Sequence, residues 1–113
     1  MTGTPSAENN STTVERIAHK NLRLEQDEDR ERYELWQGEQ FIGFLGYHDD
    51  DDVVEIQHTI IAERFGRQGY ARALVTLVLD KLRSEGKKII PQCSYVLDYL
   101  SRYPEYKDMV LRT

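Results

Sequence analysis

The strongest constraint on the fold is a long amphipathic segment that lies between two β-rich segments. Val53–Ile61 and Ile89–Ser94 are rich in β-branched and apolar residues, which predicts two strands. Gly86 ends the helix that is predicted between them, over residues 68–85. A strand, a crossover helix and another strand imply that the two strands pair in parallel. The helix is predicted because apolar residues recur at helical spacing on one stripe: Ala71, Leu74, Val75, Val78, Leu79 and Leu82.

The segments around this unit predict a small mixed fold. Tyr33–Trp36 lead into a turn at Gly38, and Phe41–Tyr47 follow as an aromatic strand, which is typical of a β-hairpin. The acidic run Asp49–Asp52 lacks the spaced oxygen ligands and the glycine of a calcium loop, so we predict a solvated turn and no metal site. A shorter helix is expected from Tyr95 to Pro104. The fold class predicted is α+β, an antiparallel meander that ends in a strand-helix-strand unit.

Length and composition bound the class of protein. The 113 residues have room for one domain, expected over residues 14–113, and the polar composition of residues 1–13 predicts a disordered leader. Fifteen lysines and arginines against 20 aspartates and glutamates give a net charge of −5, which argues against a nucleic-acid partner. No apolar run approaches the roughly 20 residues that span a membrane, and no secretory signal is visible. The single cysteine predicts a reducing, cytoplasmic compartment.

The sequence "AERFGRQGYARAL", between the first predicted strand of this unit and its helix, predicts an anion site. The first N–H groups of a helix have no partners inside the helix, and glycines let the backbone approach a phosphate. Arg64, Arg67 and Arg72 gather there in an otherwise acidic chain. The fingerprints of dinucleotide-binding folds and of P-loops are absent. A tight connection with solvent-exposed arginines is the alternative interpretation.

Three short motifs carry a family resemblance. "HT" at His58–Thr59, "GRQGYARAL" and "CSYV" at Cys93–Val96 resemble the small cysteine-containing subfamily of the GNAT N-acetyltransferases, over roughly residues 31–106. The family's coenzyme A loop has the pattern Q/R-x-x-G-x-G/A. Here Gly66 stands where Q/R is expected, and Arg67 stands where the family often has glycine, so the pair is transposed.

The resemblance implies that acetyl-CoA is the co-substrate and that it binds where the two parallel strands splay. Its pantetheine would pair with the backbone of one strand, and its diphosphate would lie on the glycine loop. Backbone contacts survive the transposition, because any residue except proline supplies an N–H. The cofactor-binding residues expected from the resemblance are Ile60, Ile61, Arg64, Gly66, Arg67, Gln68, Gly69, Tyr70 and Ala71.

Cys93 and His58 are the candidate catalytic residues. Cys93 precedes the start of the last predicted helix, and a thiol attacks as the thiolate, which a helix N-terminus or a neighbouring histidine favours. A buried, inert cysteine is the alternative. His58 is a candidate general base on the neighbouring strand. Strict alternation predicts that it shares one strand face with three apolar residues, Val54, Ile56 and Ile60.

Two mechanisms and two rival functions stay open at this stage. An amine attacks acetyl-CoA directly, or Cys93 takes the acetyl group first and passes it to the amine. The acceptor is a small-molecule amine or an exposed lysine, and oligomeric state is not predicted. One rival is a coenzyme A or acyl-CoA binder without catalysis. The other is a KH-like RNA-binding module, in which "FGRQG" would join two helices and residues 53–61 would be helical.

Overall fold

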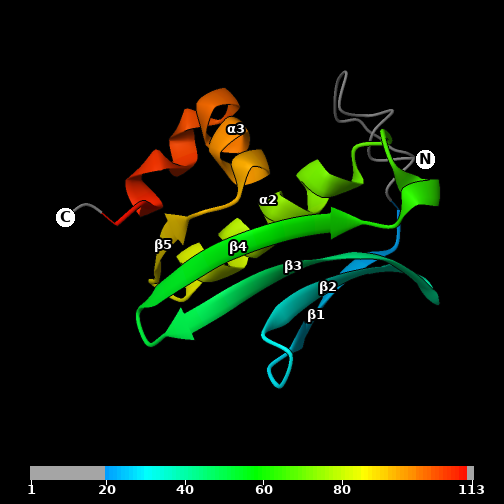
Figure 1. The fold of residues 1–113 in the computed structure, drawn as a ribbon, viewed down its shortest axis with the longest axis horizontal. Helices are drawn as coiled ribbons and strands as arrows, with labels where there is room; N and C mark the ends of the chain where they lie inside the picture. The colour runs from blue at the N-terminus through cyan, green and yellow to red at the C-terminus, as the bar shows by residue number, and fades with distance from the viewer. Residues whose placement is uncertain (1–19, 112–113) are drawn as a thin grey trace, which may run out of the picture.

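A computed structural model describes residues 20–111, and the predicted leader over residues 1–13 lies outside them. A single five-stranded sheet has its strands in sequence order, with four antiparallel strands and a last strand parallel to its neighbour (Figure 1). This arrangement confirms the predicted α+β class and the meander that ends in a strand-helix-strand unit. The strands are β1 (Leu22–Asp27), β2 (Arg32–Gln37), β3 (Gln40–Asp50), β4 (Val53–Ile61) and β5 (Lys88–Pro91).

The helical elements follow β4 and β5 in the chain. α2 (Tyr70–Ser84) connects β4 to β5 and lies behind β4 in Figure 1, whereas α3 (Ser94–Arg102) follows β5. Two 3-10 helices complete the fold, η1 (Glu63–Phe65) before α2 and η2 (Pro104–Met109) after α3. The predicted helix over residues 68–85 is confirmed, because its whole apolar stripe from Leu74 to Leu82 is buried.

β1 and the two 3-10 helices were not predicted from the sequence. Only Leu22 and Leu24 are apolar in β1, and both are only partly buried. The strand forms because its backbone pairs with all six residues of β2. The last predicted strand was too long: it ends at Pro91, and α3 begins at Ser94, so Cys93 is the N-cap of the helix and not a strand residue.

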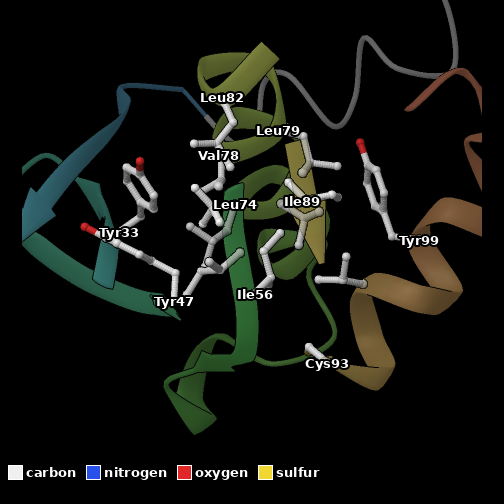
Figure 2. Close-up of a cluster of buried hydrophobic side chains, with 14 of the residues drawn as sticks. Tyr33, Tyr47, Ile56, Leu74, Val78, Leu79, Leu82, Ile89, Cys93 and Tyr99 are labelled. Atoms are coloured by element: carbon white, nitrogen blue, oxygen red, sulfur yellow. The ribbon is translucent and has the colours of Figure 1, made fainter. Parts of the chain in front are cut away.

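The core lies between α2, α3 and one face of the sheet. Ile56 of β4, Leu74 and Val78 of α2, and Ile89 of β5 are fully buried in one cluster (Figure 2). At the β2–β3 end the rings of Tyr33 and Tyr47 pack 4.9 Å apart between their centroids. Each fully buried aliphatic side chain contributes about 1.5–3 kcal/mol of transfer free energy. This core therefore fixes where β4 and β5 meet.

β4 and β5 pair over only part of their neighbouring length. Residues Val53–Ile56 pair with Lys88–Pro91, and the last link is the Gln92 N–H, which donates to the Ile56 carbonyl at 2.9 Å. β4 continues to Ile61, but no strand in residues 20–111 pairs with its β5 side beyond Ile56. The two parallel strands therefore splay, as the family resemblance predicted.

A β-bulge at Gln57 contradicts the strict alternation predicted for β4. Ile56 pairs with Tyr47 and His58 pairs with Gly46, so Gln57 is an extra residue on β4. Beyond the bulge the faces exchange: Thr59 and Ile61 turn toward the core, and His58 and Ile60 turn away from it. The prediction that His58 shares a face with Val54 and Ile56 is wrong, because one extra residue reverses every later side chain.

The sheet face that is turned away from α2 is called the outer face below. It carries His58 and Ile60 of β4 together with residues of β2 and β3 that pair across from them. No helix in the part of the chain that the structure describes packs on it, since the buried residues of α2 and α3 belong to the core cluster on the other side. Its other main residues are Arg32, Trp36, Phe41 and Phe44.

Because Tyr33 is buried, its ionisation lowers the free energy of unfolding of the protein at alkaline pH. Burial raises the pKa of Tyr33 above its ordinary value, and the neighbouring Tyr47 raises it further. The unfolded chain therefore loses this proton first, so the stabilisation is complete below about pH 10 and falls as pH rises above it. We expect Tyr33→Phe to lose less stability than the unaltered protein between about pH 8 and about pH 11, by up to about 1.4 kcal/mol per pH unit.

Urea unfolding followed by circular dichroism at several pH values measures this difference. The same two proteins compared at about pH 8 give the control, because Tyr33 is protonated in both states there. If the free energy of unfolding of the two proteins fell equally at alkaline pH, Tyr33 would not be the cause of the loss.

Candidate functional site

The loop from Ala62 to Gly69 leads from β4 into α2 and is fixed at its start. The Ala62 N–H donates to the Ile42 carbonyl at 2.8 Å, which ties the end of β4 to β3. The Phe65 and Gly66 N–H groups close the η1 turn on Ala62 and Glu63. The loop therefore delivers residues 67–69 to the start of α2 in a defined position.

Two left-handed residues shape the backbone at the start of α2. Arg67 has φ 61° and Gly69 has φ 84°, and such residues turn successive N–H groups toward a common side. Among the described residues the N–H groups of Arg67, Gly69 and Ala71 donate no backbone hydrogen bond, whereas the Ala73 N–H already bonds to the Gly69 carbonyl. With the dipole of the 15-residue helix behind them, these groups are suited to bind an anion.

The side chains predicted for this site differ in what they offer. Tyr70 is 5% exposed, its hydroxyl donates to Gln37 Oε1 at 2.9 Å, and its ring packs against Phe65 of the loop, so its side chain is largely closed to a ligand. Gln68 Nε2 donates to the Arg64 carbonyl at 3.3 Å. The Arg64 guanidinium lies 4.8 Å from the centre of the Phe65 ring, at the edge of the loop. Arg64 is therefore held near the predicted diphosphate position.

The transposition of Gly66 and Arg67 has a visible structural consequence. Gly66 adopts φ −66° and ψ 152°, an extended conformation that does not require glycine. A Cβ at this position would lie 3.3 Å from the Glu63 carbonyl oxygen. Arg67 holds the left-handed conformation that favours glycine. The backbone thus has the shape that a glycine at position 67 would take without strain.

Cys93 lies where β4 and β5 separate. It caps α3 from an extended conformation (φ −92°, ψ 129°), and Figure 2 shows it at the edge of the core cluster beside the start of that helix. Its Sγ contacts Thr59 Oγ1 at 3.6 Å, and Thr59 belongs to the part of β4 that has no β5 partner. The residue is 8% exposed. The sulfur therefore lies at the inner end of the opening between the two strands.

His58 lies on the other side of β4 from the sulfur. Its ring is exposed on the outer face, meets the Phe44 ring edge-to-face at 5.7 Å and covers Gly46, where a Cβ would come within 2.5 Å of its Nε2. The partner of Cys93 on β4 is thus Thr59, and not His58, which the sequence suggested as a candidate on the neighbouring strand. No sequence pattern predicts the bulge. Gly46, which pairs with His58, is the one local feature consistent with it, because a glycine leaves room for the His58 ring.

A small hollow between α2 and α3 adjoins the start of α2. It has a volume of about 100 Å³, and the Thr76 and Tyr99 hydroxyls are joined beside it by a 2.6 Å hydrogen bond. Burial raises the pKa of Tyr95 there, and the nearby Arg72 and Arg102 guanidinium groups oppose that rise. The sequence did not single out Arg102. The lining residues are Arg72, Tyr95, Asp98, Tyr99, Arg102 and Tyr103.

With the loop, the splayed strands and the sulfur located, comparison with known proteins gives the family. The model of the GCN5-related N-acetyltransferase family matches residues 32–109, and the chain belongs to this family. A GCN5-like protein from Staphylococcus aureus, solved in solution, is 25% identical and superposes with a TM-score of 0.62. That alignment covers 83% of this chain and 92% of the other.

Two further structures are less similar. Ard1 from Thermoplasma volcanium is 16% identical, with a TM-score of 0.48 over 74% of this chain and 54% of the other. An aminoglycoside acetyltransferase from an uncultured soil metagenomic sample is 17% identical, with a TM-score of 0.47 over 90% and 83%.

The structure bears on three questions raised by the sequence: the KH-like interpretation, metal binding and membrane-spanning segments. Residues 53–61 form a strand, which contradicts the KH-like interpretation, because that interpretation needs a helix there. No group of three or more His, Cys, Asp or Glu side chains within residues 20–111 is arranged to hold a metal ion. No helix in the same range is both long and apolar enough to cross a bilayer.

The left-handed residues predict opposite effects of two substitutions. Arg67→Gly relieves a strained backbone and should raise stability by about 0.5–1 kcal/mol, whereas Gly69→Ala introduces strain and should lower it by about 1 kcal/mol. Thermal unfolding measures both changes. Gly66→Ala serves as the matched control, since the backbone there is extended and its effect should be smaller than that of Gly69→Ala. Equal effects of the two Gly→Ala changes would contradict this account.

Gly46 predicts a way to move His58 without touching it. A Cβ at position 46 collides with the His58 ring, which is exposed and free to rotate away, so Gly46→Ala should keep the fold and displace the ring from Phe44. We expect the ring-proton shifts of His58 to change in NMR spectra. On the hypothesis from the sequence that His58 is a general base, a role commonly worth about 100-fold or more, amine acetylation should fall toward the level of His58→Ala.

A double-variant cycle controls for effects that do not pass through His58. Gly46→Ala added to His58→Ala should cause no further loss of activity. An additional loss of similar size would show that Gly46 acts by another path.

Proposed function

We propose that this protein is an acetyl-CoA-dependent N-acetyltransferase that transfers the acetyl group to a primary amine. The observation that carries the proposal is the opening between β4 and β5, with anion-binding backbone groups at one end and the Cys93 sulfur at the other. The membership of the chain in an N-acetyltransferase family supports it.

The free edge of β4 supports the expected position of the pantetheine arm. Residues 57–61 have backbone groups on their β5 side without a strand partner in the described chain, so an extended amide-containing chain can pair with them as an added strand. Ile60 and Ile61 lie in this part of β4. An arm bound there would point its thioester toward Thr59 and Cys93.

The loop at the start of α2 supports the position of the phosphates. The N–H groups of Arg67, Gly69 and Ala71 and the positive end of the α2 dipole favour a diphosphate. Arg72 and Arg102 flank the adjoining hollow and add positive charge to the same region. The charge of this region, in which two arginines outnumber the one carboxylate of the hollow, Asp98, suits a phosphorylated co-substrate.

Transfer takes one of two routes. In the covalent route, which we favour on the position of the sulfur, the Cys93 thiolate attacks the acetyl carbonyl and the thioester C–S bond breaks, so that free coenzyme A leaves as the thiol after taking up a proton. A neutral amine then attacks the acetyl-cysteine, the new C–S bond breaks, and the amide forms. In the direct route the amine attacks acetyl-CoA itself, and Cys93 only lines the site.

His58 is placed to act on the amine and not on the thiol. Its ring stands on the outer face, whereas Cys93 contacts the inner face of β4 through Thr59. A general base on the outer face takes a proton from the acceptor ammonium, and the neutral amine that results attacks the acetyl carbonyl. We therefore propose that His58 serves the acceptor and that Thr59 contacts the sulfur.

A coenzyme A binder without catalysis is the second candidate. It is favoured by the low exposure of Cys93, because a residue that is only 8% exposed presents little of its thiol to a substrate. Release of free coenzyme A with a panel of polyamines and lysine peptides separates the two functions. The single cysteine is also the ground on which we propose a reducing, cytoplasmic compartment.

Calorimetric titration with acetyl-CoA, followed by mass spectrometry of Cys93, tests the proposal. We expect saturable binding, an acetyl adduct on Cys93, and a loss of about 100-fold or more in turnover for Cys93→Ala with binding retained. Cys93→Ser is the matched control for size. Full activity of Cys93→Ala would remove the covalent route, and no binding at millimolar acetyl-CoA would remove the function.

A further inference from the structure

The outer face carries aromatic residues that the proposed cofactor site does not use. Trp36 and Phe41 pack edge-to-face at 5.6 Å, and the Arg32 guanidinium lies over Phe44 at 4.7 Å and over Phe41 at 5.8 Å. All three rings are partly exposed, and Ile60 beside Phe44 is 48% exposed. Aromatic and arginine side chains are enriched in surfaces that bind other proteins.

The two arginines of this face are already paired with carboxylates. Arg32 pairs with Glu34 at 2.8 Å, and Arg23 pairs with Glu25 at 2.6 Å while its guanidinium covers Trp36. Their charges are therefore largely balanced within the face. The excess negative charge of this face comes from other carboxylates, which lie at one end of it.

One end of the same face is strongly acidic. Glu31 of the β1–β2 connection contacts β3 there, because the Tyr47 N–H donates to the Glu31 carbonyl at 2.9 Å and His48 contacts the Glu31 carboxylate at 3.2 Å. An open hollow of about 490 Å³ beside β1 is lined by five acids and one glutamine, and three of these acids, Glu25, Asp27 and Glu34, pair with arginines. The carboxylates of this end that form no ion pair with a lysine or arginine within residues 20–111 are Glu28, Asp29 and Glu31.

His58 and the acidic hollow lie on one line across the sheet. Asp27 pairs with Arg32, Arg32 with Gly46, and Gly46 with His58. Three strand spacings separate the first residue from the last, which is roughly 14 Å. An extended peptide covers this distance with about four residues, at roughly 3.3 Å each.

We propose that the outer face docks a basic polypeptide segment and presents one of its lysines to His58. The choice of a lysine as acceptor rests on the proposed acetyltransferase function. Cationic residues about four positions from that lysine reach the acidic hollow, and the other side chains of the segment lie against Phe44, Phe41 and Trp36. A flat sheet face suits an extended polypeptide, because small molecules are bound mainly in concave pockets. Carboxylates at the rim steer a basic partner and exclude acidic ones.

Trp36 is the only tryptophan in the chain and reports docking directly. The probe is a peptide of about ten residues with alternating lysine and alanine, titrated into the full chain without acetyl-CoA at low salt. We expect a saturable change in Trp36 emission that weakens as salt is added. The matching glutamate–alanine peptide should leave the emission unchanged.

Two charge reversals of equal size give the matched comparison. Asp29→Lys changes an exposed carboxylate of the acidic hollow, and Glu105→Lys changes an exposed carboxylate on η2. Asp29→Lys should weaken peptide binding by about fivefold at low salt, and Glu105→Lys should not. Equal effects of the two, or no emission change at millimolar peptide, would overturn the docking face. Spermine that binds as tightly as the peptide would overturn the choice of a polypeptide.

A second assay separates failure of this proposal from failure of the proposed function. With acetyl-CoA present, the kcat/KM for the lysine peptide should fall in Asp29→Lys by a factor similar to that for binding. If a small amine is acetylated but the peptide leaves Trp36 unchanged, the docking face is wrong and the transferase stands. If the peptide binds but no acetyl group is ever transferred, the docking face stands and the transferase is wrong.

Discussion

The pairing of β4 with β5 stops after four residues, and the candidate site depends on that interruption. The pairing ends with the Gln92 N–H on the Ile56 carbonyl, and β4 then bulges at Gln57 while the chain beyond β5 turns into α3. The core holds both strands together up to this point through Ile56 and Ile89. Beyond it, backbone groups of β4 and the Cys93 sulfur face the same opening. A longer pairing would have closed that opening.

The bulge also divides the chemistry between two faces of the sheet. Thr59 turns inward to the sulfur, and the residue before it, His58, turns outward to Phe44. His58, the proposed base, and Cys93, the proposed nucleophile 35 positions later in the chain, can thus serve different reactants, the amine and the acetyl thioester. Because the outer face is uncovered in the described part of the chain, an acceptor reaches His58 without displacing any element. The short β1–β2 connection, residues 28–31, contains no helix that could cover this face.

The loop shows how a family pattern tolerates a local exchange of residues. Phosphate binding at a helix start depends on N–H groups, and the backbone at residues 66–69 keeps the conformation that directs them. Arg67 occupies a left-handed position at some cost in conformational energy, and its side chain brings positive charge to the same place. The exchange therefore places an arginine where the backbone conformation favours glycine.

The sequence by itself determined the strand–helix–strand unit, because the apolar stripe of α2 has the helical period and the apolar, β-branched composition of β4 favours a strand even where the bulge breaks its alternation. It also located the glycine loop and Cys93, since their residue types and order are local properties. It did not determine β1, whose two leucines form a strand only by pairing with β2. Nor did it determine the faces of His58 and Thr59. A bulge arises from the register of two strands that are distant in the chain, so only the tertiary structure decided which of the two residues meets the sulfur.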